Sequence, residues 1–393
     1  MKKSTVILIL AVLLIATLLP GCGGDSVPNT GITLEVYNWG EYISDGADDS
    51  IDVIAEFEIK TGISVHYTNF ASNEEMHTKI AEGGIQYDVI IPSDYMIGQM
   101  ISAGMLEKLN FDNIPNYKYI GDEYKHLDYD PGNEYSVPYM SGIVGIIYNK
   151  TKVTGPVDSW DILWDEQYAG EILMFNNPRD AFCIALLRRG YSVNTTNPDE
   201  IAEAAQDLKE QKRLIQAYVM DEIFNKMGGG EAALAPYYAG DAITMMAENP
   251  DLAFAVPKEG TNYFVDAMVI PKGCRNKAAA EMFINYMCEP EVSAANAEYI
   301  GYSTPIEEAR DMLDLDDEEM AIAYPDDDIL ENTEIYKNLP QSTNELMSQY
   351  WIDIKSYEEN ANQWIMPVLL AIAFVSSIVI MIRRSRKNKR DVY

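Results

Sequence analysis

Two polar corners of the sequence could bind a small molecule, because each follows an apolar run that predicts a strand. In residues 86–110, QYDVIIPSDYMIGQMISAGMLEKLN, the apolar run leaves Ser93, Asp94 and Tyr95 exposed at the predicted start of a helix. The second corner is NWGEY, residues 38–42, which places an indole, a carboxylate and a phenol side by side. Hydroxyl, carboxylate and aromatic groups of this kind fix small ligands in protein pockets.

These corners belong to a segment in which short strands alternate with amphipathic helices. Strands are predicted at residues 32–39, 63–70 and 87–93, and helices at residues 49–62, 73–84 and 95–105. This alternation indicates an α/β domain with a mostly parallel sheet. Ligands of such sheets sit beyond the carboxyl ends of the strands. Both corners lie at such ends, which makes them candidates for a ligand site.

A second α/β unit is predicted after residue 135, and the 393 residues have room for two such domains. Residues 135–153, YSVPYMSGIVGIIYNKTKV, contain two extended runs around Ser141 and Gly142 that suit a crossover between lobes. Residues 263–273, YFVDAMVIPKG, predict a strand that could cross back. The acidic segment DLDDEEMAIAYPDDD is expected to be a solvated face or loop.

Both ends of the chain carry apolar runs that point to a membrane. Residues 1–21 have a basic start, a short apolar core and small residues near the end, as secretory signals do. The ending LPGC resembles a bacterial lipobox, which implies cleavage before Cys22 and a lipid on its sulfur. The alternative is an ordinary N-terminal membrane helix.

The C-terminal run, residues 364–382, is uncharged and about as long as a bilayer requires. The basic tail, residues 383–393, follows at once, and basic residues stay on the cytoplasmic side. We therefore expect a transmembrane helix, with the preceding chain on the extracytoplasmic face of the bacterial plasma membrane. The alternative is a buried core helix.

The charge of the chain excludes one class of partner. Without the first 21 residues and those after Ile382, the chain keeps 21 basic and 61 acidic residues, a net charge of −40. Such a surface argues against nucleic acid and concentrates cations near it. With only three His and four Cys, the sequence shows no Cys/His metal cluster, and no cofactor is expected.

Six motifs occur in the order found in one known family. They are YNWGEYI, YDVIIPSDYMIGQMISAGMLEKLN, YSVPYMSGIVGIIYN, SWDILWDEQYAGEILMFNNPRDAF, LLRRGYSVNTTNPDEI and IGYSTPIEEAR. From about Leu34 to Lys355 the chain resembles the periplasmic-type polyamine-binding proteins, the substrate-binding subunits of spermidine/putrescine ABC importers. The resemblance implies a binding protein without catalytic activity. Its implied partners are a polyamine and the ABC permease subunits with their cytoplasmic ATPase.

The family fold implies two α/β lobes of the periplasmic-binding-protein type (type II), joined by hinge-crossing strands. We place lobe 1 at residues 32–143 and 265–311, and lobe 2 at residues 144–264 and 312–356. By the same resemblance, the cleft between the lobes is lined by Trp39, Glu41, Tyr42, Ser93, Tyr95, Asp180, Tyr238, Phe264, Asp266 and Tyr302.

The chemistry of a polyamine suits these residues. Its ammonium groups, like that of lysine, stay protonated near pH 7. Asp180 and Asp266 would hold them by charge-assisted hydrogen bonds, with Glu41 as a third candidate. Aromatic walls pack the methylenes and add cation–π attraction of roughly 0.5–2 kcal/mol per ring. These walls would be Trp39, Tyr95, Tyr238 and Tyr302, and Ser93 would accept a hydrogen bond.

Each of these residues also has a purely structural interpretation. Asp180 in a first helical turn could serve the helix dipole, and Ser93 could cap a helix. Trp39, Tyr238 and Tyr302 could be packing residues. Asp266 in an apolar strand is harder to explain structurally, because a buried carboxylate needs partners.

The sequence departs from the family at four places. Asn177 stands where an acid is frequent, Tyr238 and Phe264 stand where Trp is found, and Ile352 aligns with a Gln of the family. The C-terminal apolar run is also foreign to the soluble family. These changes make a shorter diamine or another cation more plausible than spermidine.

The sequence leaves three alternatives to a polyamine importer. A membrane-tethered sensor ectodomain would use the same cleft, although residues 383–393 are too short for a signalling domain. A hydrolase could use Asp180 and Asp266 as a glycosidase pair, although no G-x-S-x-G, H-E-x-x-H or phosphate loop occurs. An anion or metal site would require Arg, or more His and Cys, in one cluster.

Overall fold

Ten strands form the frame of the part of the chain that the structure describes, residues 29–47 and 50–357 of a computed structural model. Their order is β2-β1-β3-β9-β4-β7-β5-β6, with β10 beside β9 and β8 beside β4. The strands are β1 (Thr33–Trp39), β2 (Ser64–Phe70), β3 (Val89–Ile90), β4 (Ser136–Asn149), β5 (Ile172–Phe175), β6 (Ile215–Val219), β7 (Leu234–Tyr238), β8 (Leu252–Ala255), β9 (Thr261–Val269) and β10 (Thr333–Ile335).

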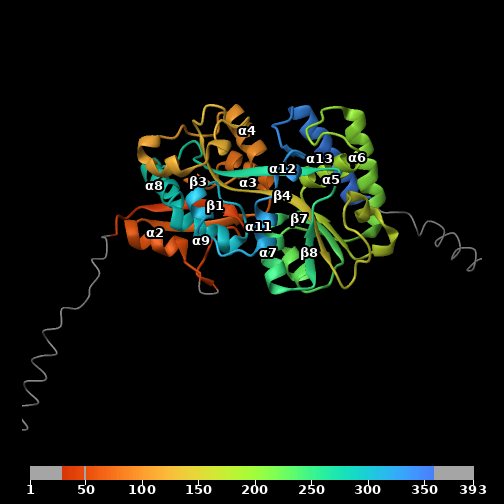
Figure 1. Ribbon diagram of the computed structural model, residues 1–393. Helices are drawn as coiled ribbons and strands as arrows, with labels where there is room; N and C mark the ends of the chain where they lie inside the picture. The colour runs from red at the N-terminus through yellow and green to blue at the C-terminus, as the bar shows by residue number, and fades with distance from the viewer. Residues whose placement is uncertain (1–28, 48–49, 358–393) are drawn as a thin grey trace, which may run out of the picture.

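The strands separate into two parallel groups that antiparallel strands connect. β1 pairs in parallel with β2 and β3, and β5 pairs in parallel with β6 and β7. β4 pairs with β9 through Ser136–Ile143 and with β7 through Val144–Tyr148, so one strand serves both groups. The molecule therefore has the two α/β lobes that the sequence predicts, with β4 and β9 between them (Figure 1). The residue numbers at which we divide the lobes stay a prediction.

Helices cover both groups of strands (Figure 1). Lobe 1, the half built on β1–β3, carries α2 (Val53–Thr61), α3 (Asn73–Glu82), α4 (Asp94–Ser102), α8 (Lys277–Met287) and α9 (Pro290–Ile300). Lobe 2, the half built on β5–β8, carries α5 (Pro178–Arg188), α6 (Pro198–Gln211), α7 (Ala239–Glu248) and α13 (Gln341–Ser356). The short helix α10 (Glu307–Arg310) precedes the acidic segment 314–328, which was expected to be a solvated face or loop, and α11 (Asp317–Ala323) and the start of α12 (Asp327–Leu330) lie in that segment.

Local sequence signals set the ends of several helices. The Asp52 carboxylate accepts a hydrogen bond from Ala55 N at the start of α2, and Gly62 ends that helix with φ 68°. The Asn177 side chain accepts from Arg179 N, and Pro178 is the first residue of α5. They begin α5 shortly after β5 (Ile172–Phe175) and place Asp180 in the first turn of the helix.

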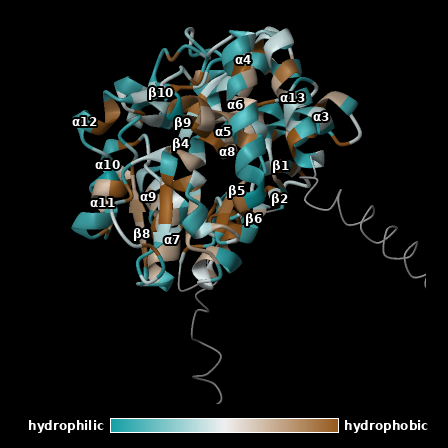
Figure 2. Cartoon of the chain, turned by 90° about the vertical axis from the view of Figure 1, so that its right-hand side faces the viewer, coloured by the Kyte–Doolittle hydropathy of each residue, from teal (hydrophilic) through white to brown (hydrophobic). Residues whose placement is uncertain are grey.

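A continuous apolar core fixes these elements in both lobes. In lobe 1, Phe57 of α2 packs edge-on against Phe283 of α8 at 5.1 Å between ring centroids. In lobe 2, Trp160, Phe175 and Phe182 are fully buried. Figure 2 shows the hydrophobic residues gathered on inner strands such as β4 and β5, while α6 turns hydrophilic residues outward. The lobes are therefore rigid supports for the residues at their facing edges.

Two sequence expectations differ from the structure. The strand predicted at 87–93 is shorter, β3 at Val89–Ile90, although Asp88 N and Ile91 N still donate to Glu35 O and Tyr37 O of β1. The two extended runs predicted around Ser141 are one strand of 14 residues, Ser136–Asn149, with a register shift near Pro138.

The predicted membrane segments lie outside the described residues. They are the signal at 1–21, the lipid acceptor Cys22, the apolar run at 364–382 and the tail at 383–393. Across residues 29–47 and 50–357, we find no helix with the length and apolar character needed to span a bilayer.

Candidate ligand-binding cavity

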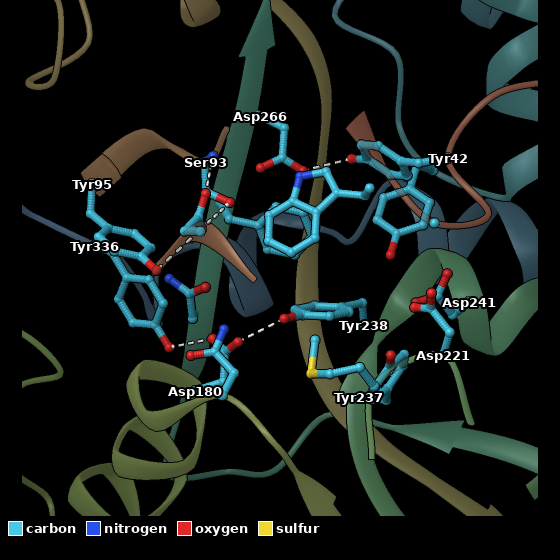
Figure 3. Close-up of a pocket in the computed structure, with 18 of the residues that line it drawn as sticks. Tyr42, Ser93, Tyr95, Asp180, Asp221, Tyr237, Tyr238, Asp241, Asp266 and Tyr336 are labelled. Carbon is cyan, nitrogen blue, oxygen red and sulfur yellow. Dashed lines mark hydrogen bonds between the residues drawn. The ribbon is translucent and has the colours of Figure 1, made fainter. Parts of the chain in front are cut away.

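A cavity lies between the two lobes, where the carboxyl ends of β1 and β3 face the ends of β5–β7 (Figure 3). Its lining consists of Trp39, Gly40, Tyr42, Asn73, Ser93, Tyr95, Asn177, Asp180, Met220, Asp221, Phe224, Tyr237, Tyr238, Asp241, Asn262, Phe264, Asp266, Tyr302 and Tyr336. The set contains four carboxylates and, among these described residues, no Lys, Arg or His. The cavity is therefore suited to a cation.

The structure brings together all but one of the residues predicted to line the cleft. Trp39, Tyr42, Ser93, Tyr95, Asp180, Tyr238, Phe264, Asp266 and Tyr302 all line the cavity. Glu41 does not: it is exposed, has φ 46°, and lines a neighbouring depression with Glu222 and Glu248. This depression shares Met220, Asp221 and Phe224 with the cavity, so Glu41 lies next to the cavity, and its role as a ligand partner stays a prediction.

The PSDY corner is joined to the crossing strand β9. An isolated bridge pairs Ser93 with Asp266, and Ala267 N donates to Pro92 O at 3.1 Å. Ser93 occupies the N-cap position of α4, but its hydroxyl makes no capping bond and instead accepts from Asn73 Nδ2 at 3.1 Å. The hydroxyl is thus directed to the cavity and does not cap the helix.

The expected exposure of Asp94 in this corner is wrong. Asp94 is fully buried, and its carboxylate accepts from Tyr95 N at 2.6 Å and from Val265 N at 3.2 Å. Burial raises the pKa of Asp94 to about 8. Asp94 therefore links α4 to β9 by hydrogen bonds, close to the bridge between Ser93 and Asp266.

Asp266 is the cavity carboxylate that has a buried oxygen without a hydrogen-bond donor among the described residues. It is 5% exposed, and Tyr42 Oη donates to its Oδ2 at 2.8 Å. Its Oδ1 has no hydrogen-bond partner among the described residues. Burial raises the pKa of Asp266 to about 6, while the nearby Ser93 side chain and the bond from Tyr42 lower it. A buried carboxylate oxygen without a donor is costly, and an ammonium group would satisfy it.

Asp180 reaches the cavity from lobe 2, in the first turn of α5. Tyr238 Oη donates to its Oδ2 at 2.6 Å, and Tyr336 Oη donates to its Oδ1 at 3.0 Å (Figure 3). Burial raises the pKa of Asp180 to about 6, and the two phenols oppose that rise. The phenols hold the carboxylate in place, so its position in the cavity is fixed before any ligand arrives.

Four rings form a continuous wall from one lobe to the other. Tyr238 meets Phe264 at 5.5 Å, Phe264 meets Tyr302 at 6.2 Å, and Tyr302 meets Tyr42 at 4.8 Å, all edge to face. Gly240 makes this possible, because a Cβ there would lie 2.0 Å from the ring of Tyr302. A wall of this kind packs methylene groups and presents ring faces to cations.

Two further carboxylates in the cavity were not predicted from the sequence. Burial raises the pKa of Asp241 to about 8 and also raises the pKa of Asp221, which lies near Glu41. A Cβ on Gly40 would lie 2.2 Å from Asp221 Oδ2, so the missing side chain lets the two lobes approach here. Asp241 lies in the first turn of α7, directly after β7. An acid at this position is a signal from which the sequence could have predicted this cavity residue. Asp221 follows β6, a strand that was not predicted.

The C-terminal residue of the chain that lines the cavity was not predicted from the sequence. Ile352, aligned with a cleft position, is 60% exposed on α13 and does not line the cavity. Tyr336, directly after the three-residue strand β10, lines it instead and donates to Asp180. So short a strand has no periodicity that a sequence could reveal.

A metal centre finds no support in the described residues, where no group of three or more His, Cys, Asp or Glu is placed to hold an ion. The acids of the cavity are separated by aromatic rings, and Asp180, Asp266 and Asp241 lie on different sides of it (Figure 3). That separation suits a ligand with several spaced positive charges.

Comparisons with known proteins agree with this geometry. The profile of the family described as bacterial extracellular solute-binding protein matches residues 52–325. The spermidine/putrescine-binding periplasmic protein of Escherichia coli is 32% identical over 328 residues, covering 82% of this chain and 92% of that protein. The putrescine-binding periplasmic protein SpuD of Pseudomonas aeruginosa is 28% identical over 363 residues, covering 88% and 97%.

Two solved structures share the fold. One, from Listeria monocytogenes and named for a spermidine/putrescine ABC transporter, is 38% identical with a TM-score of 0.79, covering 83% of this chain and 99% of that chain. The spermidine/putrescine ABC transporter substrate-binding protein PotD of Streptococcus pneumoniae is 36% identical with a TM-score of 0.70, covering 84% and 100%. The resemblance inferred from the six motifs is therefore confirmed. The chain belongs to the bacterial extracellular solute-binding proteins and, among them, to the substrate-binding proteins of spermidine/putrescine ABC transporters, which bind solutes without catalysing a reaction.

Proposed function

We propose that this protein captures an aliphatic polyamine of the putrescine/spermidine class between its lobes and delivers it to an ABC importer. The observation that carries the proposal is the unpartnered Oδ1 of Asp266 in a cavity with four carboxylates and no described basic side chain. Ammonium groups would pair with Asp266 and Asp180, and methylenes would pack on the wall from Tyr238 to Tyr42. The relatives are named as binding proteins of transporters, which favours an importer over a sensor.

Calorimetric titration of the folded chain tests the ligand class. We expect putrescine, spermidine or spermine to bind with micromolar or better affinity, about −8 kcal/mol or stronger. The matched control is 1,4-butanediol, which has the carbon chain of putrescine without its charges, and it should give no heat. Absence of heat with all three amines, or equal heat with the diol, would refute the proposal.

We also propose that the protein is held at the extracytoplasmic face of the plasma membrane by a lipid on Cys22 and by a span at residues 364–382. The support is the LPGC ending, the uncharged C-terminal run and the basic tail after it. The described chain starts beside α2 of lobe 1 and ends beyond α13 of lobe 2, at opposite ends of the molecule (Figure 1). Each lobe would thus have its own attachment, which keeps the protein near its permease.

Membrane fractionation of four chains checks this attachment. The full chain, Cys22→Ala and a chain ending at Tyr357 should each sediment with membranes, because at least one anchor remains in each. The double variant should be released. If the full chain stays in the aqueous fraction, or the double variant sediments with membranes, the two-anchor proposal fails.

A further inference from the structure

One wall of the cavity is shared by the two lobes and has an acidic and a basic side chain, Glu74 and Arg179, behind it. Tyr95 of lobe 1 and Tyr336 meet edge to face at 5.7 Å between ring centroids. The Arg179 guanidinium, from the first turn of α5 in lobe 2, lies 5.6 Å from the centroid of Tyr95 and 4.6 Å from that of Tyr336. Glu74, from the first turn of α3 in lobe 1, accepts from Tyr95 Oη at 2.9 Å.

Arg179 is buried and Glu74 is half-buried, and each has a buried polar atom without a hydrogen-bond partner among the described residues. Arg179 is 6% exposed, and its Nη2 donates to Asn194 Oδ1 at 3.0 Å and to Lys337 O at 3.4 Å. Its Nε has no hydrogen-bond partner among the described residues, and neither does Glu74 Oε2. Leaving a buried donor and a buried acceptor unpaired costs about 1–3 kcal/mol for each group, more when it is charged.

The two groups face each other across the lobes. Glu74, Tyr95 and Arg179 all line one groove on the outer side of the cavity wall, formed by α3 and α4 of lobe 1 and by α5 and α13 of lobe 2. Burial raises the pKa of Glu74, and a backbone hydrogen bond, the hydrogen bond from Tyr95 and, least, the charge of Arg179 counteract that rise. A small movement of one lobe against the other would therefore change the distance between them.

We propose that Glu74 and Arg179 form an ion pair across the lobes when the lobes close on a ligand, and that this pair holds the cavity shut. Arg179 adjoins Asp180, and Glu74 adjoins Asn73, which lines the cavity, so the pair lies directly behind ligand-facing residues. The two residues are positioning residues: they touch the tyrosine wall and not the ligand. Like the site it closes, this pair rests on the proposed polyamine function.

A double-mutant cycle measured with putrescine and spermidine tests the pair. Glu74→Gln and Arg179→Met should each weaken binding about tenfold, through faster dissociation at an unchanged association rate. The double variant should lose about tenfold and not a hundredfold, because both changes remove the same interaction. Glu75→Gln is the matched control, since it removes an exposed acid one residue along α3 and should leave the affinity unchanged.

The outcomes separate this inference from the proposed function. If the unaltered protein binds no polyamine, the proposed function fails. If it binds, but Glu74→Gln binds equally well or the two losses multiply, the ion pair is refuted while the function stands. Arg179→Lys should recover part of the loss by keeping the charge, which a role in packing alone would not explain. Thermal unfolding without ligand identifies a variant that fails to fold. If an Arg179 variant does not fold, the affinity of Glu74→Gln alone decides whether the ion pair exists.

Discussion

Asp266→Asn should weaken polyamine binding by two orders of magnitude or more while the protein stays folded. The asparagine keeps the shape of the side chain and can still accept the hydrogen bond from Tyr42. It loses the negative charge beside Oδ1, the cavity atom without a donor. Removing one member of a buried, hydrogen-bonded charge pair costs about 2–5 kcal/mol, or roughly 30- to 5,000-fold in affinity. Titration calorimetry measures the loss directly.

Asp314→Asn is the control for bulk charge. Asp314 is an exposed acid in the DLDDEE segment, so its substitution removes the same charge as Asp266→Asn. Its affinity should match that of the unaltered protein. Asp180→Asn should behave like Asp266→Asn, since the amide keeps a partner for Tyr238 but not the charge. Equal losses in Asp314→Asn and Asp266→Asn would mean that the net charge attracts the ligand and that no specific site exists.

Polyamine affinity should fall about 100-fold between pH 7 and pH 5. Burial raises the pKa of Asp180 and of Asp266 to about 6, so both carboxyls become protonated across this interval. An ammonium ligand binds the ionised form, and each protonation reduces the affinity by about tenfold over two pH units around such a pKa. Titrations in buffers from pH 5 to pH 8 would show the fall.

The protein without ligand should respond to pH in the opposite direction. A carboxyl whose folded-state pKa lies above its unfolded value binds more protons when folded, so its contribution to stability decreases as the pH rises through about 4–6. Acidification from pH 7 to pH 5 should therefore raise the melting temperature without ligand. Relief of general charge repulsion acts in the same direction, and Asp180→Asn/Asp266→Asn separates the two effects. A double variant with the same pH profile as the unaltered protein would show that these two carboxyls are not responsible.

Local patterns in the sequence were sufficient for the elements that bear the site. Strand–helix alternation predicted β1, β2, α2 and α3, because amphipathic periods and caps such as Asp52 and Gly62 act over a few residues. The rule that ligands lie beyond the carboxyl ends of strands placed Ser93, Tyr95 and Trp39 in the cavity without any knowledge of lobe 2. Short strands such as β10 were not predicted, because they are stabilised by their neighbours and have too few residues to show a period.

The sequence by itself thus determined the two-lobed fold class, the acidic and aromatic character of the site and most of its residues. Only the tertiary structure decided which acids share the cavity, because that depends on pairing between segments far apart in the chain. The bridge between Ser93 and Asp266 brings Asp266 to one side, and the approach of Asp221 to Gly40 brings lobe 2 to the other. The same pairing leaves Glu41 outside the cavity and buries Asp94, which the sequence predicted to be exposed, between α4 and β9. Periodicity reports which face of an element is buried, whereas a binding site forms where several elements end together.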